Sequence, residues 1–254
     1  MSPAGSTAIL SALPEEQAGL LAQLEGARRH TIASRDFWLG RLQGRPVVLA
    51  LSRIGKVSAS LTASVLIGHL GVSRIVFTGV AGGLAPGVRV GDVVVALDFI
   101  QHDLDASPLF PRYEVPLYGR ARFACEPSLT SLLRTAASQA LGPYGTAAIG
   151  LPVGVIVHSG LIASGDRFIS SADESRALQS ALRGAGHEAL AVEMEGAAVA
   201  QVCADYDVPF AAMRTISDRA DDTAHIDFPR FVNEVASRYA LAIINQLMQS
   251  LPAS

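Results

Sequence analysis

The stretch that decides the fold is ALAVEMEGAAVAQVCADYDVPFAAMRTISD, residues 189–218. It opens with a short apolar run at 189–194 and closes with another at 208–217, and each run predicts a buried strand. The residues between them, 195–207, predict a helix. Two strands that are joined by a helix form a parallel pair with a crossover connection. The stretch therefore predicts an α/β fold.

The same alternation of strand and helix continues on the N-terminal side and at the C-terminal end. Further strands are expected at 8–13, 37–42, 45–52, 74–80, 92–100 and 154–165, and further helices at 14–29, 56–71, 127–142 and 230–251. This pattern predicts a single α/β domain with a mixed, mostly parallel central sheet that is flanked by helices. The domain is expected to span residues 8–254, after a disordered tail at 1–7. Residues 101–122 are expected to form a long irregular loop, and loops of that length are usually functional or disordered.

Composition narrows the class of protein. Hydrophobic residues make up 50% of the chain and charged residues 17%, so a large core can be buried. The net charge of -3, with no dense stripe of Lys and Arg, argues against a nucleic-acid partner. No apolar run is long enough to span a membrane, and the N-terminus lacks a signal-peptide pattern, so we expect a cytoplasmic protein without a membrane partner.

The two cysteines, Cys125 and Cys203, lie in or beside apolar stretches. Their spacing does not match that of metal ligands, so they are expected to be small buried hydrophobic residues. The sequence gives no indication of a metal or of a cofactor.

Carboxylates follow three of the expected strands. In open α/β sheets, ligands bind beyond the carboxyl ends of the strands, where Glu16, Glu195 and Asp218 are found. Like charges that share a desolvated cleft are costly, so their convergence indicates a functional site. The alternative for Asp218 is an ordinary polar strand end or helix cap.

A glycine-rich turn, TGVAGGL at 78–84, follows another expected strand. The backbone N–H groups around Ala81 and Gly82 are suited to binding an oxygen-rich ligand, although a plain tight turn explains the sequence as well. The sequence contains neither G-x-G-x-x-G nor a P-loop, so the common nucleotide-binding motifs are excluded.

A stretch that overlaps the first one resembles the 5′-methylthioadenosine/S-adenosylhomocysteine nucleosidases of the purine nucleoside phosphorylase family: AVEMEGAAVAQVCADYDVPFAAMRTISDRAD at 191–221. Further segments match this family in the same order: ALPEEQAGLL (12–21), SRIGKVSAS (52–60), TGVAGGLAPGVRVGDVVV (78–95), QHDLDA (101–106) and SGDRFI (164–169). The resemblance covers nearly the whole chain. It is more specific for the superfamily than for the substrate.

The resemblance implies hydrolysis of the bond between adenine and the anomeric carbon of a 5-thio-substituted ribose. Such a reaction needs an acid for the leaving base and carboxylates near the positively charged sugar. Asp218 is similar to the acid that protonates the purine at N7, and burial would raise its pKa. Glu16 is similar to the base that activates water, Glu195 to the residue that binds the ribose hydroxyls, and Arg214 to a residue that helps to place the water.

The same resemblance assigns residues to substrate binding. Phe168 is similar to the aromatic residue that stacks on adenine, although a core residue is the alternative, and Ile169 would offer backbone hydrogen bonds to the base. Met194 would pack against the sugar, and Ser217 would orient Asp218.

Ile54 and Phe228 are similar to the apolar walls of the pocket for the 5′ substituent. In the family this pocket is completed by a second subunit, and the segment Ala106–Phe110 matches the part that crosses over. The resemblance therefore implies a homodimer.

Two positions depart from the family pattern. Val80 stands where Ser is expected, and Arg53 stands where Gly is common. An arginine there is compatible with an anion site and hence with a purine nucleoside phosphorylase. Glu16 would lie close to that anion, however, and two like charges about 4 Å apart repel by about 4 kcal/mol at a surface-like dielectric, which favours the hydrolase.

Two further alternatives remain. The base-binding residues do not distinguish the expected nucleosidase from a related hydrolase that acts on futalosine-type nucleosides. A non-catalytic nucleoside-binding protein is less favoured, because such a protein needs neither a proton donor nor a water-activating carboxylate. Three other charged residues are expected outside the chemistry, with Lys56 as a cation at the start of a helix and Asp221 and Asp222 in the loop that flanks the site.

Overall fold

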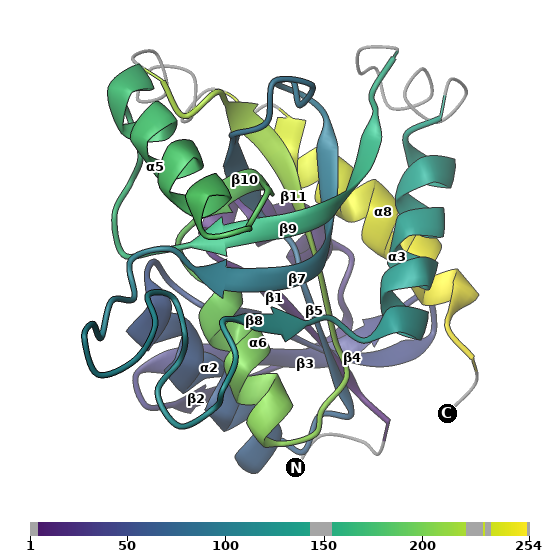
Figure 1. Cartoon of the computed structure of the whole chain (residues 1–254). Helices are drawn as coiled ribbons and strands as arrows, with labels where there is room; N and C mark the ends of the chain where they lie inside the picture. Colours follow the sequence, from purple (N-terminus) through teal and green to yellow (C-terminus); the bar gives the residue numbers. More distant parts are fainter. Residues whose placement is uncertain (1–4, 143–153, 222–230, 232–234, 253–254) are drawn as a thin grey trace.

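The computed structural model describes residues 5–142, 154–221, 231 and 235–252 (Figure 1). The strands of this part of the chain form one mixed sheet in the order β2-β3-β4-β1-β5-β11-β6-β10-β9-β7-β8. The strands are β1 (Thr7–Ser11), β2 (Glu25–Ile32), β3 (Arg35–Leu42), β4 (Arg45–Leu51), β5 (Arg74–Phe77), β6 (Val80–Gly83), β7 (Val93–Gln101), β8 (Arg122–Ala124), β9 (Val157–Ser164), β10 (Ala189–Glu193) and β11 (Phe210–Asp218). The helices are α1 (Pro14–Ala22), α2 (Lys56–Gly68), α3 (Pro127–Ala140), α5 (Ala172–Gly184), α6 (Gly196–Asp205) and α8 (Ser237–Ser250). This confirms the single α/β domain with a mixed sheet flanked by helices.

Helices cover both faces of the sheet because its strands are apolar on both faces. In β1, successive side chains point to opposite sides. Ile9 packs in a cluster with residues of α1, α3 and α8, whereas Ala8 and Leu10 pack in a cluster with residues of α2 and α6. Figure 1 shows α3 and α8 together beside one face, with α2 and α6 beside the other.

Strand β11 joins the two halves of the sheet. Its first residues pair with β5 in parallel, its last residues pair with β6 in parallel, and its middle pairs with β7 in antiparallel orientation. Strands β6, β10, β9 and β7 also pair in succession. The five strands therefore close into a ring, and the end of β11 lies against β6 beside β10.

The helix expected at 14–29 is wrong in its second half. Helix α1 ends at Ala22, and β2 begins at Glu25 as an edge strand. Gly26 has a φ of +62°, a left-handed conformation that does not continue a helix. The side chains of β2 are almost all exposed, so no apolar alternation marks this strand in the sequence.

The strand expected at 74–80 is two strands, because β5 ends at Phe77 and β6 begins at Val80. The break lets the chain leave one neighbour for another, since β5 pairs with β1 and β6 pairs with β10. A Cβ on Gly79, within the break, would lie 3.2 Å from the Glu16 carboxylate. Glycine there leaves room for that side chain.

Helix α5 was not expected, although its sequence carries a helix-start pattern. Ser171 is its N-cap, and the Ser171 side chain accepts a hydrogen bond from the backbone N–H of Glu174. A Ser followed three residues later by Glu is a recognised start signal. The hairpin of β3 and β4 and the irregular segment between β7 and β8 agree with expectation.

The ends of the domain differ slightly from the expected bounds. Strand β1 begins at Thr7, inside the expected tail, of which residues 1–4 lie outside the described part of the chain. Helix α8 is described from Ser237, and most of the earlier part of the expected final helix lies outside the described residues. In the part that is described, no helix is long and apolar enough to cross a membrane.

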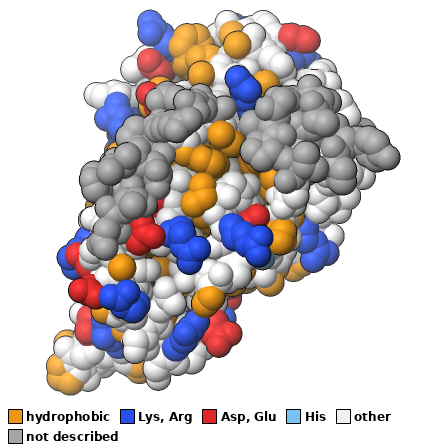
Figure 2. Space-filling view, turned by 90° about the horizontal axis from the view of Figure 1, so that it is seen from above, with side chains coloured by type: hydrophobic (Ala, Val, Ile, Leu, Met, Phe, Trp, Pro, Cys, Tyr) orange, Lys and Arg blue, Asp and Glu red, His pale blue; other side chains and the backbone are white. Residues whose placement is uncertain are grey.

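Seen from above, the molecule exposes hydrophobic side chains together with both positive and negative ones (Figure 2).

Candidate active site

A cavity of about 480 Å³ lies at the ends of several strands. Every predicted site residue that the structure describes lines it: Glu16, Ile54, Ala81, Gly82, Phe168, Ile169, Met194, Glu195, Arg214, Ser217 and Asp218. Phe228 lies outside the described residues. Residues from positions 12 to 218 therefore meet around one space, although their roles stay predictions.

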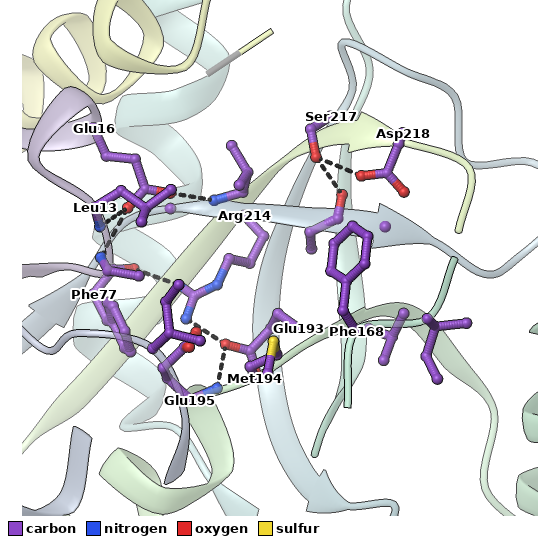
Figure 3. A pocket seen from close by; sticks show the side chains of 18 of the residues that line it. Leu13, Glu16, Phe77, Phe168, Glu193, Met194, Glu195, Arg214, Ser217 and Asp218 are labelled. Atoms are coloured by element: carbon purple, nitrogen blue, oxygen red, sulfur yellow. Dashed lines mark hydrogen bonds and ion pairs between the residues drawn. The ribbon is translucent and has the colours of Figure 1, made fainter. Parts of the chain in front are cut away.

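The cavity has two ends, and a carboxylate lies toward each of them (Figure 3). Glu16 lies toward one end, beside Leu13. Asp218 and Phe168 lie toward the other end, and Glu195 and Met194 lie between the two. A ligand that spans the cavity would meet one carboxylate at each end.

Asp218 is the last residue of β11, and its carboxylate is held in place by two donors. Ser217 Oγ donates to Asp218 Oδ2 at 2.8 Å, and the backbone N–H of Ala220 donates to Oδ1 at 2.7 Å. The residue is only 2% exposed. A Cβ on Gly82 would lie 3.0 Å from Asp218 Oδ1 and 2.8 Å from the Ala220 Cβ, so glycine permits this close approach of β6.

Glu16 lies in the first turn of α1 and accepts three backbone hydrogen bonds. Its Oε2 accepts from Ala12 N at 2.8 Å and Leu13 N at 2.9 Å, and its Oε1 accepts from Val80 N at 3.1 Å. Burial raises the pKa of Glu16 above its ordinary value, although these bonds and the charge of Arg214 act in the opposite direction. The bond from Val80 is made by the backbone, so it does not depend on the Ser that is replaced there.

Glu193 is a charged residue of the cavity that the sequence reasoning missed. Its Oε2 lies 2.7 Å from Arg214 Nη2, and the two side chains are 3% and 2% exposed. Arg214 Nη1 also donates to the carbonyl oxygens of Phe77 and Met213, and its guanidinium lies 4.0 Å from the centre of the Phe77 ring. The sequence did contain a signal for this residue. A carboxylate inside a buried strand is costly unless it is paired, so Glu193 within an apolar run indicates a buried partner.

Glu195 lies two residues beyond Glu193, before α6. Its Oε1 accepts a hydrogen bond from Gly55 N at 2.8 Å. Burial is the main cause that raises its pKa from 4.5 to about 8, and the negative charge of Glu193 adds to it. Burial and the nearby Glu193 therefore favour the protonated form of Glu195.

The adenine-stacking and 5′-pocket candidates lie partly open to solvent. Phe168 is 44% exposed and Ile54 is 57% exposed, whereas Ile169 is buried. The segment Ala106–Phe110 contributes no lining residue to the cavity of its own chain, and its Leu109 is 84% exposed. Among the described residues, the part of the cavity rim that Phe168 and Ile54 form is therefore open to solvent.

The remaining candidates lie away from the cavity. The Arg53 side chain donates to the backbone oxygen of Ser34 and does not line the cavity. Cys125 and Cys203 are buried, and burial raises the pKa of each thiol above its ordinary value, which agrees with their expected role as hydrophobic residues. In the described ranges, no group of three or more His, Cys, Asp or Glu is arranged to hold a metal ion.

Comparison with known proteins identifies the family. The model of the phosphorylase superfamily matches residues 6–248. The chain is 35% identical to the 5′-methylthioadenosine/S-adenosylhomocysteine nucleosidase of Mycobacterium tuberculosis, over 94% of this chain and 95% of that protein. The chain belongs to the phosphorylase superfamily.

Solved structures support the same grouping. The nucleosidase from Neisseria meningitidis in complex with methylthio-immucillin-A superposes with a TM-score of 0.86 at 32% identity, covering 97% of this chain and 100% of that one. The native structure of futalosine hydrolase of Helicobacter pylori superposes with a TM-score of 0.84 at 30% identity, covering 97% and 98%. The relatives named by these comparisons are nucleoside-cleaving hydrolases, and the chain is an enzyme of this class, an N-glycosyl hydrolase.

Proposed function

We propose that the protein hydrolyses the N-glycosidic bond of 5′-methylthioadenosine and S-adenosylhomocysteine, and releases adenine and the 5-thio-substituted ribose. The observation that carries the proposal is the position of Glu16 and Asp218 toward opposite ends of one cavity (Figure 3). Hydrolysis needs an acid at the leaving base and a base at the attacking water, on opposite sides of the anomeric carbon. The named relatives support the choice of substrate.

At the base end, Asp218 is the general acid. It donates its proton to N7 as the bond to the anomeric carbon breaks, so adenine leaves as a neutral molecule. The bonds from Ser217 and Ala220 fix the carboxyl group, and positioning of this kind lowers the entropic cost of reaching the transition state. Phe168 stacks on the adenine ring, and the backbone of Ile169 binds its edge.

At the sugar end, Glu16 is the general base. It takes one proton from a water molecule, whose oxygen forms the new bond to the anomeric carbon. The three backbone hydrogen bonds hold the Glu16 carboxylate, and Arg214 lies near enough to lower the pKa of Glu16. Glu195 binds the ribose hydroxyls, and Met194 packs against the sugar ring.

The charges that line the cavity favour water over phosphate as the nucleophile. Four acidic side chains line it, those of Glu16, Glu193, Glu195 and Asp218, and the proposed base Glu16 would repel a phosphate that took the place of the water. Two cations line the described part of the cavity: the buried Arg214 is paired with Glu193, and the exposed Arg167 is paired with Glu174. A phosphate site needs cations that are free to clamp the anion. Arg53, the residue that pointed to such a site, does not line the cavity.

A second copy of the chain completes the pocket for the 5′ substituent. Ile54 is half exposed at the rim, and Val57 and Leu61 on the following helix are 82% and 41% exposed. Leu109 in the irregular segment is also exposed. Apolar groups that are open in one chain are covered when two copies exchange these segments, and the pocket then suits an apolar methylthio group. We propose a homodimer on this basis, and a cytoplasmic location because the two cysteines are free.

Futalosine-type nucleosides are the second candidate substrates, because the Helicobacter pylori futalosine hydrolase has a similar structure. A panel of methylthioadenosine, S-adenosylhomocysteine, adenosine and a futalosine-type nucleoside, followed by release of the free base, separates the candidates. The proposal expects the two thio-substituted nucleosides to react fastest, with adenosine slower because it does not fill the apolar 5′ pocket. Preferential cleavage of the futalosine-type nucleoside would contradict it, and no cleavage of any would favour a binding protein.

A further inference from the structure

Lys56, the only lysine in the sequence, lies between two carboxylates at the start of α2. Its Nζ is 2.5 Å from Asp103 Oδ1 and 3.8 Å from Asp166 Oδ2. The sequence predicts it as a cation at the start of a helix, and the structure places it there with a side chain that is only 16% exposed. The helix dipole disfavours a cation at a helix N-terminus, so helix α2 by itself does not explain why a lysine occupies position 56.

The backbone at the same place holds two carboxylates as well. The Lys56 N–H donates to Asp166 Oδ1 at 2.7 Å, and the preceding Gly55 N–H donates to Glu195 Oε1 at 2.8 Å. The Asp166 N–H in turn donates to Asp103 Oδ2 at 2.8 Å. Carboxylates are stabilised at a helix N-terminus, so α2 receives its caps from distant segments rather than from its own residues.

Each partner belongs to a segment with a role in the proposed function. Asp166 begins the loop that carries Phe168 and Ile169, which the proposal assigns to adenine. Glu195 is assigned to the ribose hydroxyls. Asp103 lies just before the segment that the proposal assigns to the pocket of the second copy. One dipeptide, Gly55–Lys56, therefore contacts the base-binding, sugar-binding and dimer-crossing parts of the chain.

The position of Asp166 against α2 is close. Gly55 has a φ of +92°, and a Cβ at this position would lie 3.1 Å from Asp166 Oδ1. Glycine thus provides both the left-handed backbone and the space for the carboxylate. Asp166 thus receives the Lys56 N–H and lies near the Lys56 ammonium group, whereas the Gly55 N–H donates to Glu195.

We propose that Lys56, with Asp103 and Asp166, forms a positioning network that holds the adenine-binding loop in register with Glu195, so that base and ribose are bound together. The inference rests on the proposed roles of Phe168, Ile169 and Glu195. Lys56 does not line the cavity, so it acts through these residues and not on the substrate. Loss of the network loosens the loop and weakens ground-state binding, and it leaves the acid Asp218 in place.

The test compares KM and kcat for methylthioadenosine in Lys56→Met, which keeps the side-chain length and removes the charge. We expect KM to rise about tenfold, the size of effect given by loss of a charge-assisted hydrogen bond, with a much smaller change in kcat. Asp166→Asn, on a half-exposed side chain, is expected to give the same pattern. The Asp166→Asn variant tests the network if Lys56→Met fails to fold.

Arg122→Met is the matched control, because Arg122 makes a partly exposed ion pair with Asp98 away from the cavity. Its KM should equal that of the wild type. NMR of the protein with selectively labelled lysine adds a second measurement. The single lysine gives a single backbone amide signal, and addition of adenine should shift this signal in the wild type. A wild type that releases adenine, combined with an unchanged KM in both network variants, would overturn the inference. A wild type that releases no adenine would instead overturn the proposed function.

Discussion

Arg214 Nη2 lies 2.7 Å from Glu193 Oε2, and this ion pair is almost completely buried in the wall of the cavity. Glu193 also accepts hydrogen bonds from Ser164 Oγ and from the backbone N–H of Gly196. The charge of Arg214 extends to Glu16, whose pKa it lowers. One arginine thus compensates a structural carboxylate and acts on a proposed catalytic one.

Removing the charge of Glu193 should strongly destabilise the fold. Glu193→Gln leaves the Arg214 guanidinium buried without its counter-charge, and breaking a buried ion pair from one side costs about 3–5 kcal/mol. Urea denaturation monitored by circular dichroism measures this loss. The control is Asp173→Asn in the exposed pair with Arg176, which should cost less than about 1 kcal/mol. An equal loss in the free energy of unfolding for the two variants would show that the buried ion pair stabilises the fold no more than the exposed one.

Glu193 also marks the limit of what the sequence predicts about the site. Glu16, Glu195 and Asp218 were found because each comes after an apolar run, where ligands bind in an open sheet. Glu193 lies inside such a run, at the end of β10, and a pattern of apolar residues does not show which buried carboxylate has a partner. Its partner Arg214 is 21 positions away and in another strand.

The fold was predicted best where burial is strong. The apolar runs of β1, β4 and β11 are visible because both faces of these strands are covered, whereas β2 is exposed and carries no apolar pattern. The closure of the sheet through β11 and β7 was not predictable, because it depends on long-range pairing between Met213 and Val95 and their neighbours. The contacts of Lys56 were missed for the same reason.

Glu195 should make stability depend on pH. Its pKa is raised from 4.5 to about 8, so the stabilisation is fully present below pH 4.5 and is lost as the pH rises through about 8. Between these values the contribution falls by about 1.4 kcal/mol per pH unit. The facing groups are Glu193, Glu16, Arg214 and the Gly55 N–H.

Urea denaturation of the wild type and Glu195→Gln at pH 5, 6, 7 and 8 measures this dependence. The free energy of unfolding of the wild type should fall more steeply with pH than that of the variant, because glutamine does not ionise. Parallel curves would show that Glu195 does not titrate in this range.

Glu16→Gln should reduce kcat about a hundred- to ten-thousand-fold, because glutamine cannot accept the proton of water. In the wild type the base must be ionised, and burial raises its pKa. The acid limb of kcat/KM should therefore lie above 4.5, with activity falling as the pH is lowered through it. The neighbouring exposed acid gives the control, since Glu15→Gln should keep normal turnover and the same acid limb. Comparable losses in both variants would refute the assignment of Glu16.

Asp218→Asn should lose about a hundred- to ten-thousand-fold in turnover, since asparagine keeps the shape but transfers no proton to the leaving adenine. Binding of an uncharged substrate analogue, followed by calorimetry, should be much less affected. Asp221→Asn is the control from the same charged segment, and Asp221 does not line the cavity. Near-normal turnover in Asp218→Asn with loss in Asp221→Asn would mean that the wrong carboxylate was assigned.

The sugar product formed from methylthioadenosine in the presence of phosphate tests the central claim most directly. The proposed base Glu16 and two arginines that are already paired, Arg167 and Arg214, line the described cavity, so water and not phosphate should attack the anomeric carbon. Chromatography and mass spectrometry of the products should show adenine and free 5-methylthioribose, with a rate that does not change when phosphate is added. The 1-phosphate ester as the main sugar product, or a rate that depends on phosphate, would contradict the account.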